Sequence, residues 1–133
     1  MLTKIDHIGI AVRDLEEAMK VYGDFTLKDA DHIEELDSEG VKIAFFNVGE
    51  SSIELLQPIR EDCAIAKHIS KRGEGIHHIC YAVEDLEKAM KSLVDKGYRC
   101  LDETPRDGAH NTKVAFFHPK QTLSTLIELS QKK

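Results

Sequence analysis

The chain has little that would support a cross-linked or membrane-spanning fold. Its only cysteines, Cys63, Cys80 and Cys100, are odd in number and far apart in the sequence. They predict neither a disulfide framework nor a cysteine-rich metal site, and we interpret them as buried free thiols. No stretch approaches the roughly 18 apolar residues that a membrane-spanning helix needs. The first strand-like run begins at Ile5 with no signal peptide before it, so we expect a cytoplasmic protein without a membrane partner.

The sequence also lacks the features of a nucleic-acid-binding or nucleotide-binding protein. Charged residues make up 32% of the chain and its net charge is −6, with acidic and basic residues intermixed. This pattern is typical of a solvated surface and argues against nucleic-acid affinity. A low-complexity tract and a glycine-rich nucleotide-binding loop are both absent. A chain of 133 residues is large enough for one hydrophobic core but too small for two independent ones.

What the sequence does contain is one motif written twice. Residues 5–20 (IDHIGIAVRDLEEAMK) and 76–91 (IHHICYAVEDLEKAMK) are identical at 11 of 16 positions, at an offset of 71 residues. The same offset relates KIAFF, which begins at Lys42, to KVAFF, which begins at Lys113. The IEL triplets are related by an offset of 74, which predicts three additional residues between the last two strands of the second copy. The chain is therefore a tandem duplication of one structural unit.

Each copy has the pattern of a strand, a helix and three further strands. Residues 5–12 alternate between an aliphatic face and a face of small residues with one histidine, as expected of a strand. Asp14 then supplies a helix N-cap, and apolar residues from Leu15 to Tyr22 follow at the spacing of an amphipathic helix. Asp85 begins the same pattern in the second copy. A polar stretch with a short strand, the KIAFF or KVAFF strand, a turn and the IEL strand complete each copy.

We therefore predict an α+β fold in which two tandem βαβββ modules form a curved mixed sheet around a shared cleft. Module one covers about residues 3–57, and module two covers about residues 76–131. The linker of about residues 58–75 contains a short helical pattern at 62–72. Because the chain is too short for two cores, the modules must pack together as a single domain of residues 1–133. Matched polar residues would meet in the cleft.

A histidine and a glutamate interrupt the apolar strands at matched positions of both copies. His7 aligns with His78, and Glu54 aligns with Glu128. A carboxylate inside an apolar strand costs several kcal/mol to bury unless it meets a cation or strong hydrogen-bond donors. The four side chains form a His₂Glu₂ set of nitrogen and oxygen donors that suits Zn²⁺, Co²⁺, Ni²⁺ or Mn²⁺. We predict that they bind one divalent metal ion per chain.

The alternative is that these residues are structural. A strand histidine is usually a hydrogen-bonded structural residue, and duplication also preserves pairs that serve packing alone. The metal interpretation is favoured because the four residues are the ionisable ones in otherwise apolar strands of both copies. Of the other histidines, His77 aligns with Asp6 and should face away from the cleft, His32 and His68 should lie on the surface, and His118 is a turn histidine. The polar loop 108–113 fits an anion contact and a hairpin equally well.

Five strings that run in order over nearly the whole chain carry a family resemblance. DHIGIAV, IELLQP, GIHHICYAV, GAHNTKVAFFHPK and LIEL together resemble the methylmalonyl-CoA epimerases of the vicinal oxygen chelate superfamily, which includes glyoxalase I. The resemblance implies paired βαβββ modules around a metal-containing cleft, with His7, Glu54, His78 and Glu128 as the metal ligands. Two departures matter. Some members have glutamine where this chain has Glu54, and a proposed catalytic glutamate of some members lies on the strand matching residues 41–46, which carries no acid here.

The resemblance predicts a homodimeric epimerase that interconverts the 2R and 2S epimers of methylmalonyl-CoA through a metal-stabilised enolate. We assign Glu54 and Glu128 as candidate acid-base residues, since the duplication supplies one carboxylate from each copy. Lys113 is the candidate for contact with a phosphate of the acyl-CoA, because its strand belongs to the predicted cleft. Water or an acid of the segment 31–39 is the alternative base: Asp31, Glu34, Glu35, Asp37 or Glu39. Alternative functions are lactoylglutathione lyase (glyoxalase I) and a non-catalytic small-ligand-binding module, and the strings GAHNTKVAFFHPK and HHICYAV favour the epimerase over the lyase.

Overall fold

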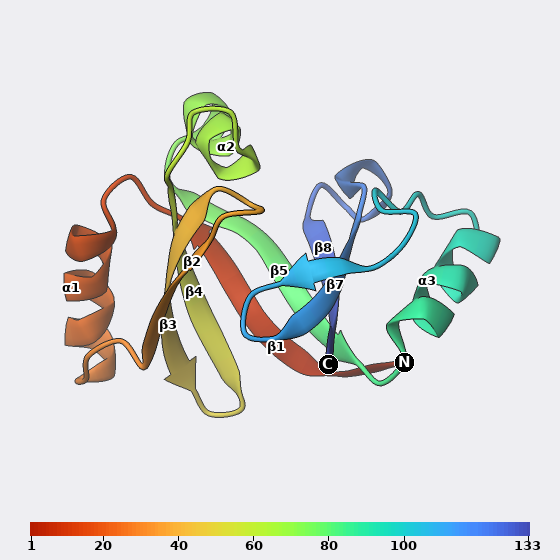
Figure 1. Ribbon diagram of the computed structural model, residues 1–133, viewed down its shortest axis with the longest axis horizontal. Helices are drawn as coiled ribbons and strands as arrows, with labels where there is room; N and C mark the ends of the chain where they lie inside the picture. Colours follow the sequence, from red (N-terminus) through yellow and green to blue (C-terminus); the bar gives the residue numbers. More distant parts are fainter. The chain divides into compact units, whose positions relative to one another are not determined.

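The computed structural model describes residues 1–133 and confirms the predicted repeat of elements (Figure 1). The order strand, helix and three strands occurs twice, and a short helix joins the two copies. The first copy consists of β1 (Leu2–Ala11), α1 (Leu15–Thr26), β2 (His32–Leu36), β3 (Val41–Val48) and β4 (Ser51–Pro58). The linker contains α2 (Ala64–Arg72). The second copy consists of β5 (Gly75–Val83), α3 (Leu86–Asp95), β6 (Arg106–Gly108), β7 (Thr112–Phe117), the 3-10 helix η1 (Pro119–Gln121) and β8 (Leu126–Lys132).

The chain divides into two compact halves whose boundaries differ slightly from those of the repeat. The first half is His7–His77, and the second half is His78–Lys133 together with Met1–Asp6. In the second half, Oγ1 of Thr3 donates a hydrogen bond to the carbonyl oxygen of Ala82 at 3.2 Å. The second half therefore takes one strand segment from the start of the chain.

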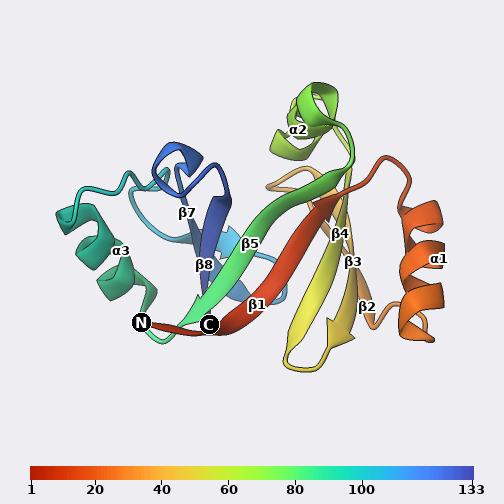
Figure 2. The same ribbon diagram turned by 180° about the vertical axis from the view of Figure 1, so that it is seen from behind.

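Both halves contain a mixed sheet with the same strand order. In the first half the order is β2-β3-β4-β1, and in the second half it is β6-β7-β8-β5. All neighbouring strands within these sheets are antiparallel except the pairs β1/β4 and β5/β8, which are parallel. Figure 2 shows the parallel neighbours β1 and β4, and β5 and β8, side by side. The duplicated sequence thus forms a duplicated sheet topology.

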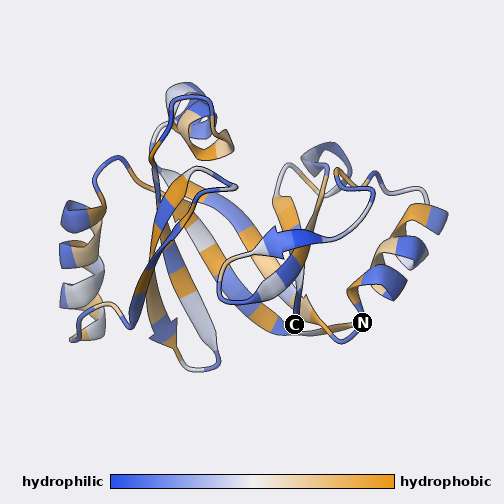
Figure 3. Cartoon of the chain, in the orientation of Figure 1, coloured by the Kyte–Doolittle hydropathy of each residue, from blue (hydrophilic) through white to orange (hydrophobic).

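One face of each sheet is covered by the amphipathic helix of the same half. Hydrophilic and hydrophobic segments alternate along α1 and α3 (Figure 3), and the apolar side chains pack onto the sheet. The core under α1 contains Val12, Leu15, Ala44, Phe46 and Leu55. The core under α3 contains Val83, Leu86, Ala89, Met90, Ala115, Phe117 and Leu129. Complete burial of one large apolar side chain contributes roughly 1.5–3 kcal/mol, so these clusters hold each helix to its sheet.

Matched polar side chains fix the start of both helices. The Oδ1 atoms of Asp14 and Asp85 accept hydrogen bonds from the backbone N–H three residues later, at 3.2 and 3.0 Å, as the sequence predicts. Gln57 of β4 and Gln131 of β8 add a second bond, because their Oε1 atoms accept from the first N–H of α1 and of α3 at 2.6 and 2.8 Å. These bonds satisfy helix N–H groups that have no partner within the helix. Each helix start is therefore tied to a strand of its own half.

The connections between the last two strands differ in length as the repeat offset predicts. Strands β3 and β4 are joined by a two-residue turn whose Gly49 has a φ of 61°. Strands β7 and β8 are joined by η1 and a further turn in which Leu123 and Ser124 have φ angles of 60° and 64°. The predicted three-residue insertion thus lies between β7 and β8.

The cysteines and the linker helix agree in most respects with the sequence predictions. All three cysteines are free, with Cys63 and Cys80 buried and Cys100 half-buried. Burial raises the pKa of the Cys100 thiol. The Sγ of Cys63 accepts from the backbone N of Ala66 at 3.4 Å and begins α2, which lies within the segment predicted to be helical. None of the helices has the length and apolar composition required to cross a membrane.

Candidate functional site

A histidine and a glutamate meet on the sheet face of the first half that is opposite to α1. The Nδ1 of His7 on β1 lies 2.9 Å from Oε2 of Glu54 on β4. Gly9, two residues after His7, is the Cα partner of Glu54 in the parallel pair of these strands. The two side chains are only 8% and 9% exposed. A single ionised group in this buried setting would be costly, so the pairing stabilises both side chains.

The second half contains the equivalent pair. The Nε2 of His78 on β5 lies 3.0 Å from Oε1 of Glu128 on β8, and the side chains are 7% and 8% exposed. Cys80, two residues after His78, is the Cα partner of Glu128 in the parallel pair β5/β8. The two His–Glu pairs therefore occupy the same position in their respective sheets. They differ in that the carboxylate meets Nδ1 in the first half and Nε2 in the second.

Strand alternation separates His78 from its neighbour His77. His78 is buried against Glu128, whereas the ring of His77 packs edge-to-face on the ring of His68 from α2, with centroids 4.9 Å apart at an angle of 86°. This agrees with the repeat register, which aligns His78 with His7. The prediction that His68 lies on the surface is wrong in part, because the residue is half-buried in this contact. Burial lowers the pKa of His68, and the positive charge of Arg72 lowers it further.

A phenylalanine lies across from each of these glutamates on the neighbouring strand. Phe45 of β3 is the Cα partner of Glu54, and Phe116 of β7 is the Cα partner of Glu128. The ring of Phe116 also packs edge-to-face against the ring of His78, with centroids 5.8 Å apart at an angle of 82°. These apolar rings keep water away from the pairs and strengthen electrostatic interactions beside them.

In the first half His32 packs against the ring of Phe45, and Glu34 pairs with His32. The ring centroid of His32 lies 5.3 Å from that of Phe45, and Nε2 of His32 lies 3.0 Å from Oε1 of Glu34. Glu34 is the Cα partner of Ile43, which alternates with the core residue Ala44. Both polar residues therefore lie on the face of the His7 and Glu54 pair, so the structure places a further carboxylate on this face.

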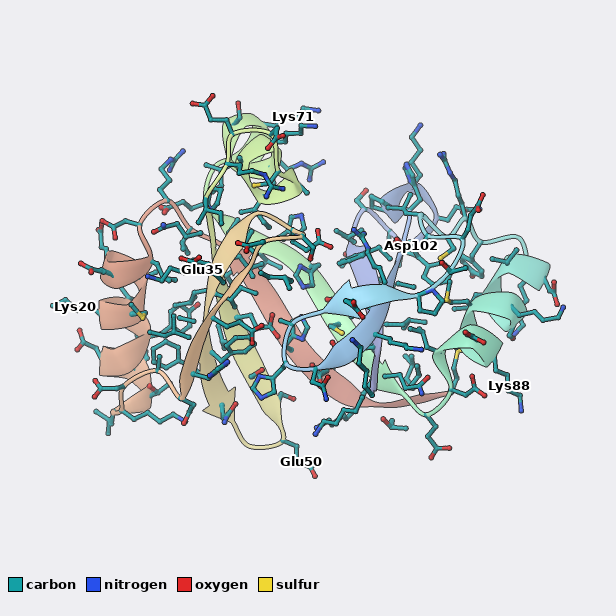
Figure 4. All side chains as sticks on the ribbon, in the orientation of Figure 1. Lys20, Glu35, Glu50, Lys71, Lys88 and Asp102 are labelled. Atoms are coloured by element: carbon teal, nitrogen blue, oxygen red, sulfur yellow. The ribbon has the colours of Figure 1, made fainter.

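In the second half Arg106 packs over the ring of Phe116. The guanidinium carbon of Arg106 lies 4.8 Å from the ring centroid of Phe116. The Nε of Arg106 lies 3.0 Å from Oδ1 of Asp102, which is labelled in Figure 4. Arg106 is the Cα partner of Val114, just as Glu34 is the partner of the matched Ile43. The two halves thus have opposite charges at the same sheet position.

The segment 31–39 contains five acids, and the structure distinguishes among them. Glu34 lies on the face of the His–Glu pair, whereas Glu35 pairs with Lys42 and points to the face of α1 (Figure 4). Oδ2 of Asp31 accepts hydrogen bonds from Nζ of Lys28 and from a backbone N–H of β3, each at 2.7 Å. These bonds, with the one from Lys28 the largest cause, lower the pKa of Asp31 and make it a poor proton acceptor. The other two acids lie in the turn between β2 and β3.

Lys113 lies on the other face of β7 from Phe116. Its Cα partner is Gln131, whose side chain binds the start of α3, and the lysine is exposed. Alternation then places Val114 and Phe116, but not Lys113, on the face of Glu128. The predicted contact of Lys113 with a substrate phosphate stays a prediction, and it does not belong to the face of the His–Glu pair.

The remaining predicted polar positions have structural partners. The loop 108–113 forms the β6–β7 hairpin, in which His110 and Asn111 have φ angles of 59° and 57°. The hairpin interpretation is confirmed, and the anion contact stays a prediction. His118 is a turn histidine as predicted, because its Nδ1 accepts from the backbone N of Lys120 at 3.1 Å at the start of η1.

Comparison with known proteins gives the family. Residues 6–116 match the Glyoxalase/Bleomycin resistance protein/Dioxygenase superfamily. The chain belongs to this superfamily. An ethylmalonyl-CoA/methylmalonyl-CoA epimerase of Cereibacter sphaeroides is 38% identical over 133 residues, which cover 98% of this chain and 99% of that protein. The predicted resemblance is thereby confirmed.

Solved structures with high similarity confirm the fold class. A methylmalonyl-CoA epimerase of Mycobacterium tuberculosis superposes with a TM-score of 0.94 at 36% identity, covering 99% of this chain and 89% of that chain. A methylmalonyl-CoA epimerase in complex with methylmalonyl-CoA and NH₄⁺ superposes with a TM-score of 0.93 at 36% identity, covering 99% and 96%. These similarities extend over nearly the whole chain, so they concern both copies of the βαβββ module.

Glyoxalase superfamily enzymes use divalent metals, and the donor chemistry of this chain fits such an ion. Each half has one imidazole within 3.0 Å of one carboxylate, and all four side chains are less than a tenth exposed. Imidazole nitrogen and carboxylate oxygen are ligands that first-row divalent ions accept. Burial beside an apolar phenylalanine also limits competition from water for the ligand atoms.

Sequence reasoning missed the polar residues that pack on Phe45 and Phe116 and the aspartates beside them. Asp31 and Asp102 are related by the repeat offset of 71. Asp31 accepts a hydrogen bond from a backbone N–H of β3, and Asp102 accepts one from a backbone N–H of β7. The match of the two aspartates is visible in the sequence, whereas their basic partners, Lys28 and Arg106, are known only from the structure. The position of Arg106 beside Phe116 depends on strand pairing and could not be read from spacing alone.

Proposed function

We propose that the chain is a divalent-metal-dependent epimerase that interconverts the 2R and 2S epimers of methylmalonyl-CoA. The main support is that proteins named as epimerases of this substrate match nearly the whole chain, in sequence and in structure. The buried His–Glu pair in each half supplies the chemical groups that such a reaction requires. Removal of a proton next to a thioester produces an enolate, whose negative charge must be stabilised.

We propose His7, Glu54, His78 and Glu128 as the ligands of one divalent ion, with each half contributing one pair. Co²⁺, Zn²⁺, Ni²⁺ and Mn²⁺ all fit a set of two nitrogens and two oxygens. The bound ion would supply Lewis-acid stabilisation of the charge that develops on the substrate oxygens. The chain's own contribution is to hold the four ligands in buried, prearranged pairs.

Glu54 and Glu128 are also the proposed acid-base residues. Epimerisation removes the α-proton from one face of the carbon and returns a proton to the other face, so it requires two proton-transfer groups. The duplication supplies one carboxylate per half for this purpose. A carboxylate bound to a metal is a weakened base, and Glu34 is therefore the alternative: it lies on the same face as His7 and Glu54 and is held by His32 at 3.0 Å.

The substrate contact, the oligomeric state and the location are proposals that follow from the same assignment. Acyl-CoA binding is supported by the structural neighbour that contains methylmalonyl-CoA. For this chain we propose a homodimer in the cytoplasm, with exposed Lys113 as a contact for a phosphate of the CoA moiety.

Turnover assays with the purified protein test the proposed function against its two rivals. A single epimer of methylmalonyl-CoA should be converted to a mixture of the 2R and 2S epimers, whereas methylglyoxal plus glutathione should give no lactoylglutathione. Conversion of the second substrate pair alone would identify a glyoxalase I-type lyase. Ligand binding without turnover of either substrate, in protein reconstituted with each of the four metals, would identify a non-catalytic binding module.

A further inference from the structure

Strand β6 presents one basic side chain on the face of the second half that carries the His–Glu pair. Arg106 is the Cα partner of Val114, which alternates with the core residue Ala115 and shares its face with Glu128. Gly108 is the other residue of β6 on this face, and a Cβ at that position would lie 2.6 Å from Cγ1 of Val114. Arg106 therefore supplies the single β6 side chain on this face.

The guanidinium of Arg106 is oriented from two sides. Asp102 lies 3.0 Å from its Nε, and the ring of Phe116 lies beneath it at 4.8 Å. Asp102 is itself fixed, because its Oδ2 accepts from the backbone N of Phe116 at 2.8 Å and its side chain is 12% exposed. The arginine side chain is 42% exposed, so a ligand in solvent has access to it. A guanidinium held in this way loses little side-chain freedom when it binds an anion.

Phe116 connects Arg106 to the candidate metal ligands. Its ring carries the guanidinium on one side and packs edge-to-face against the ring of His78 at a centroid distance of 5.8 Å. An anionic group bound by Arg106 would therefore lie on the sheet face of the His78 and Glu128 pair, at the Phe116 ring that His78 also contacts. The matched position of the first half carries Glu34, so that half would repel the same anion.

We propose that Arg106 binds the substrate carboxylate and thereby selects thioesters that carry a carboxylate on the carbon next to the carbonyl. The inference rests on the proposed epimerase function and extends it to substrate choice. Guanidinium and carboxylate form two parallel charge-assisted hydrogen bonds, which fix the orientation of the carboxylate as well as its position. Asp102 acts as a positioning residue, because it holds the guanidinium over Phe116.

Binding measurements on the metal-loaded full chain test this assignment with two thioesters. Methylmalonyl-CoA carries the carboxylate, and propionyl-CoA lacks it but has the same CoA moiety. Loss of a charge-assisted pair in R106Q should weaken methylmalonyl-CoA binding by about 10- to 100-fold and leave propionyl-CoA within about twofold. R106K keeps a cation beside Asp102 but not the planar fork, and its loss on methylmalonyl-CoA alone should be intermediate. R99Q, a matched charge removal at an exposed position of the same half, should behave as wild type.

Each other result overturns the proposal in a recognisable way. Equal weakening of both thioesters by R106Q would assign Arg106 to the CoA moiety. Unchanged affinity for both, with a lower melting temperature, would make Arg106 a structural link between β6 and Phe116. If R106Q does not fold, the same comparison is made with R106K, and equal affinity losses for the two thioesters overturn the proposal. A wild-type protein that binds neither thioester would overturn the epimerase function itself, and the role of Arg106 with it.

Discussion

Each half contains the same buried His–Glu pair, and the two halves differ in the residues at the edge of that pair. Both place a histidine and a glutamate on parallel neighbouring strands, with nitrogen-to-oxygen distances of 2.9 and 3.0 Å, and both place a phenylalanine across from the glutamate. Beyond the phenylalanine, the first half carries His32 with Glu34 and the second half carries Arg106 with Asp102. The positions proposed to hold the metal carry the same residues in both copies, whereas the neighbouring positions carry opposite charges. A pseudosymmetric scaffold can in this way bind a substrate that is not symmetric.

The matched aspartates show how small the structural change between the halves is. Asp31 and Asp102 each accept from a backbone N–H of β3 or β7 and each hold one basic side chain. In the first half that base is Lys28, which follows α1 in the chain. In the second half it is Arg106 on the face of the His–Glu pair. The same anchoring residue therefore serves the loop in one half and the candidate site in the other.

The largest expected effect tests the two matched His–Glu pairs as metal ligands. His7→Ala or His78→Ala should each remove most of the bound metal and abolish epimerase activity, because each half is proposed to supply two of four ligands. Loss of a residue that only supports a ligand costs about 10- to 100-fold in metal affinity, and loss of a ligand should exceed this. Elemental analysis after dialysis measures it. His77→Ala is the control and should retain metal, and full metal occupancy in either ligand variant would exclude that histidine from the site.

The second prediction tests whether Glu54 and Glu128 transfer protons on opposite faces of the substrate's α-carbon. Glu54→Gln or Glu128→Gln keeps an oxygen ligand but removes one proton acceptor, so activity should fall about 10²- to 10⁴-fold at unchanged metal content. Starting from one epimer in deuterated water, a variant that lacks one acceptor should still exchange the α-proton without inverting the centre, and the two variants should do so from opposite epimers. A loss below about tenfold in both, with metal retained, would make these carboxylates ligands only.

The third prediction compares two adjacent acids on opposite faces of β2. If Glu54 and Glu128 transfer the protons, Glu34→Gln should reduce kcat by less than about tenfold, below the usual range for an acid-base residue. Glu35→Gln is the matched control, because Glu35 points to the face of α1, and it should have no effect. A fall of 10²-fold or more in Glu34→Gln alone would move the proton acceptor of the first half from Glu54 to Glu34.

The fourth prediction concerns pH and the anchoring aspartate of the first half. The hydrogen bond from Lys28 lowers the pKa of Asp31 below its ordinary value, so the charged form is favoured in the folded state. The resulting stability is present above the unfolded pKa and is lost as the pH falls through the folded pKa. Asp31→Asn should therefore lower the melting temperature slightly at neutral pH and have no effect once the carboxyl is protonated in both states. Melting curves from pH 7 to pH 2 measure this, and a pH-independent difference would show that charge is not the cause.

The smallest expected effect concerns Lys113. Because this exposed lysine lies on the face of β7 away from Phe116, its substitution by glutamine should leave kcat unchanged. A contact with a CoA phosphate would raise KM by a few-fold, with a larger difference at low salt because exposed charges are screened. Steady-state kinetics at two ionic strengths measure this. A fall in kcat without a change in KM would contradict the phosphate assignment.

Local sequence signals predicted the elements correctly because each depends on nearby residues. Asp14 and Asp85 cap the two helices where the sequence places them, and the offset of 74 in the IEL strands corresponds to the longer β7–β8 connection. The repeat register also selected His78 over His77, which pack against Glu128 and His68 respectively. Lys113 shows the limit of such signals, since its place in a strand of the predicted cleft does not determine which face of that strand it occupies.

The sequence by itself determined the duplication, the order of the elements and the pairing of histidine with histidine and glutamate with glutamate. These follow from periodicity and from an offset, which are properties of a single line of residues. Only the tertiary structure decided which side chains meet across strands: Phe116 with Glu128, and Arg106 with Phe116 and Asp102. The register between strands is set by turn lengths and by packing against the helices, and a shift of one residue would turn each of these side chains to the opposite face.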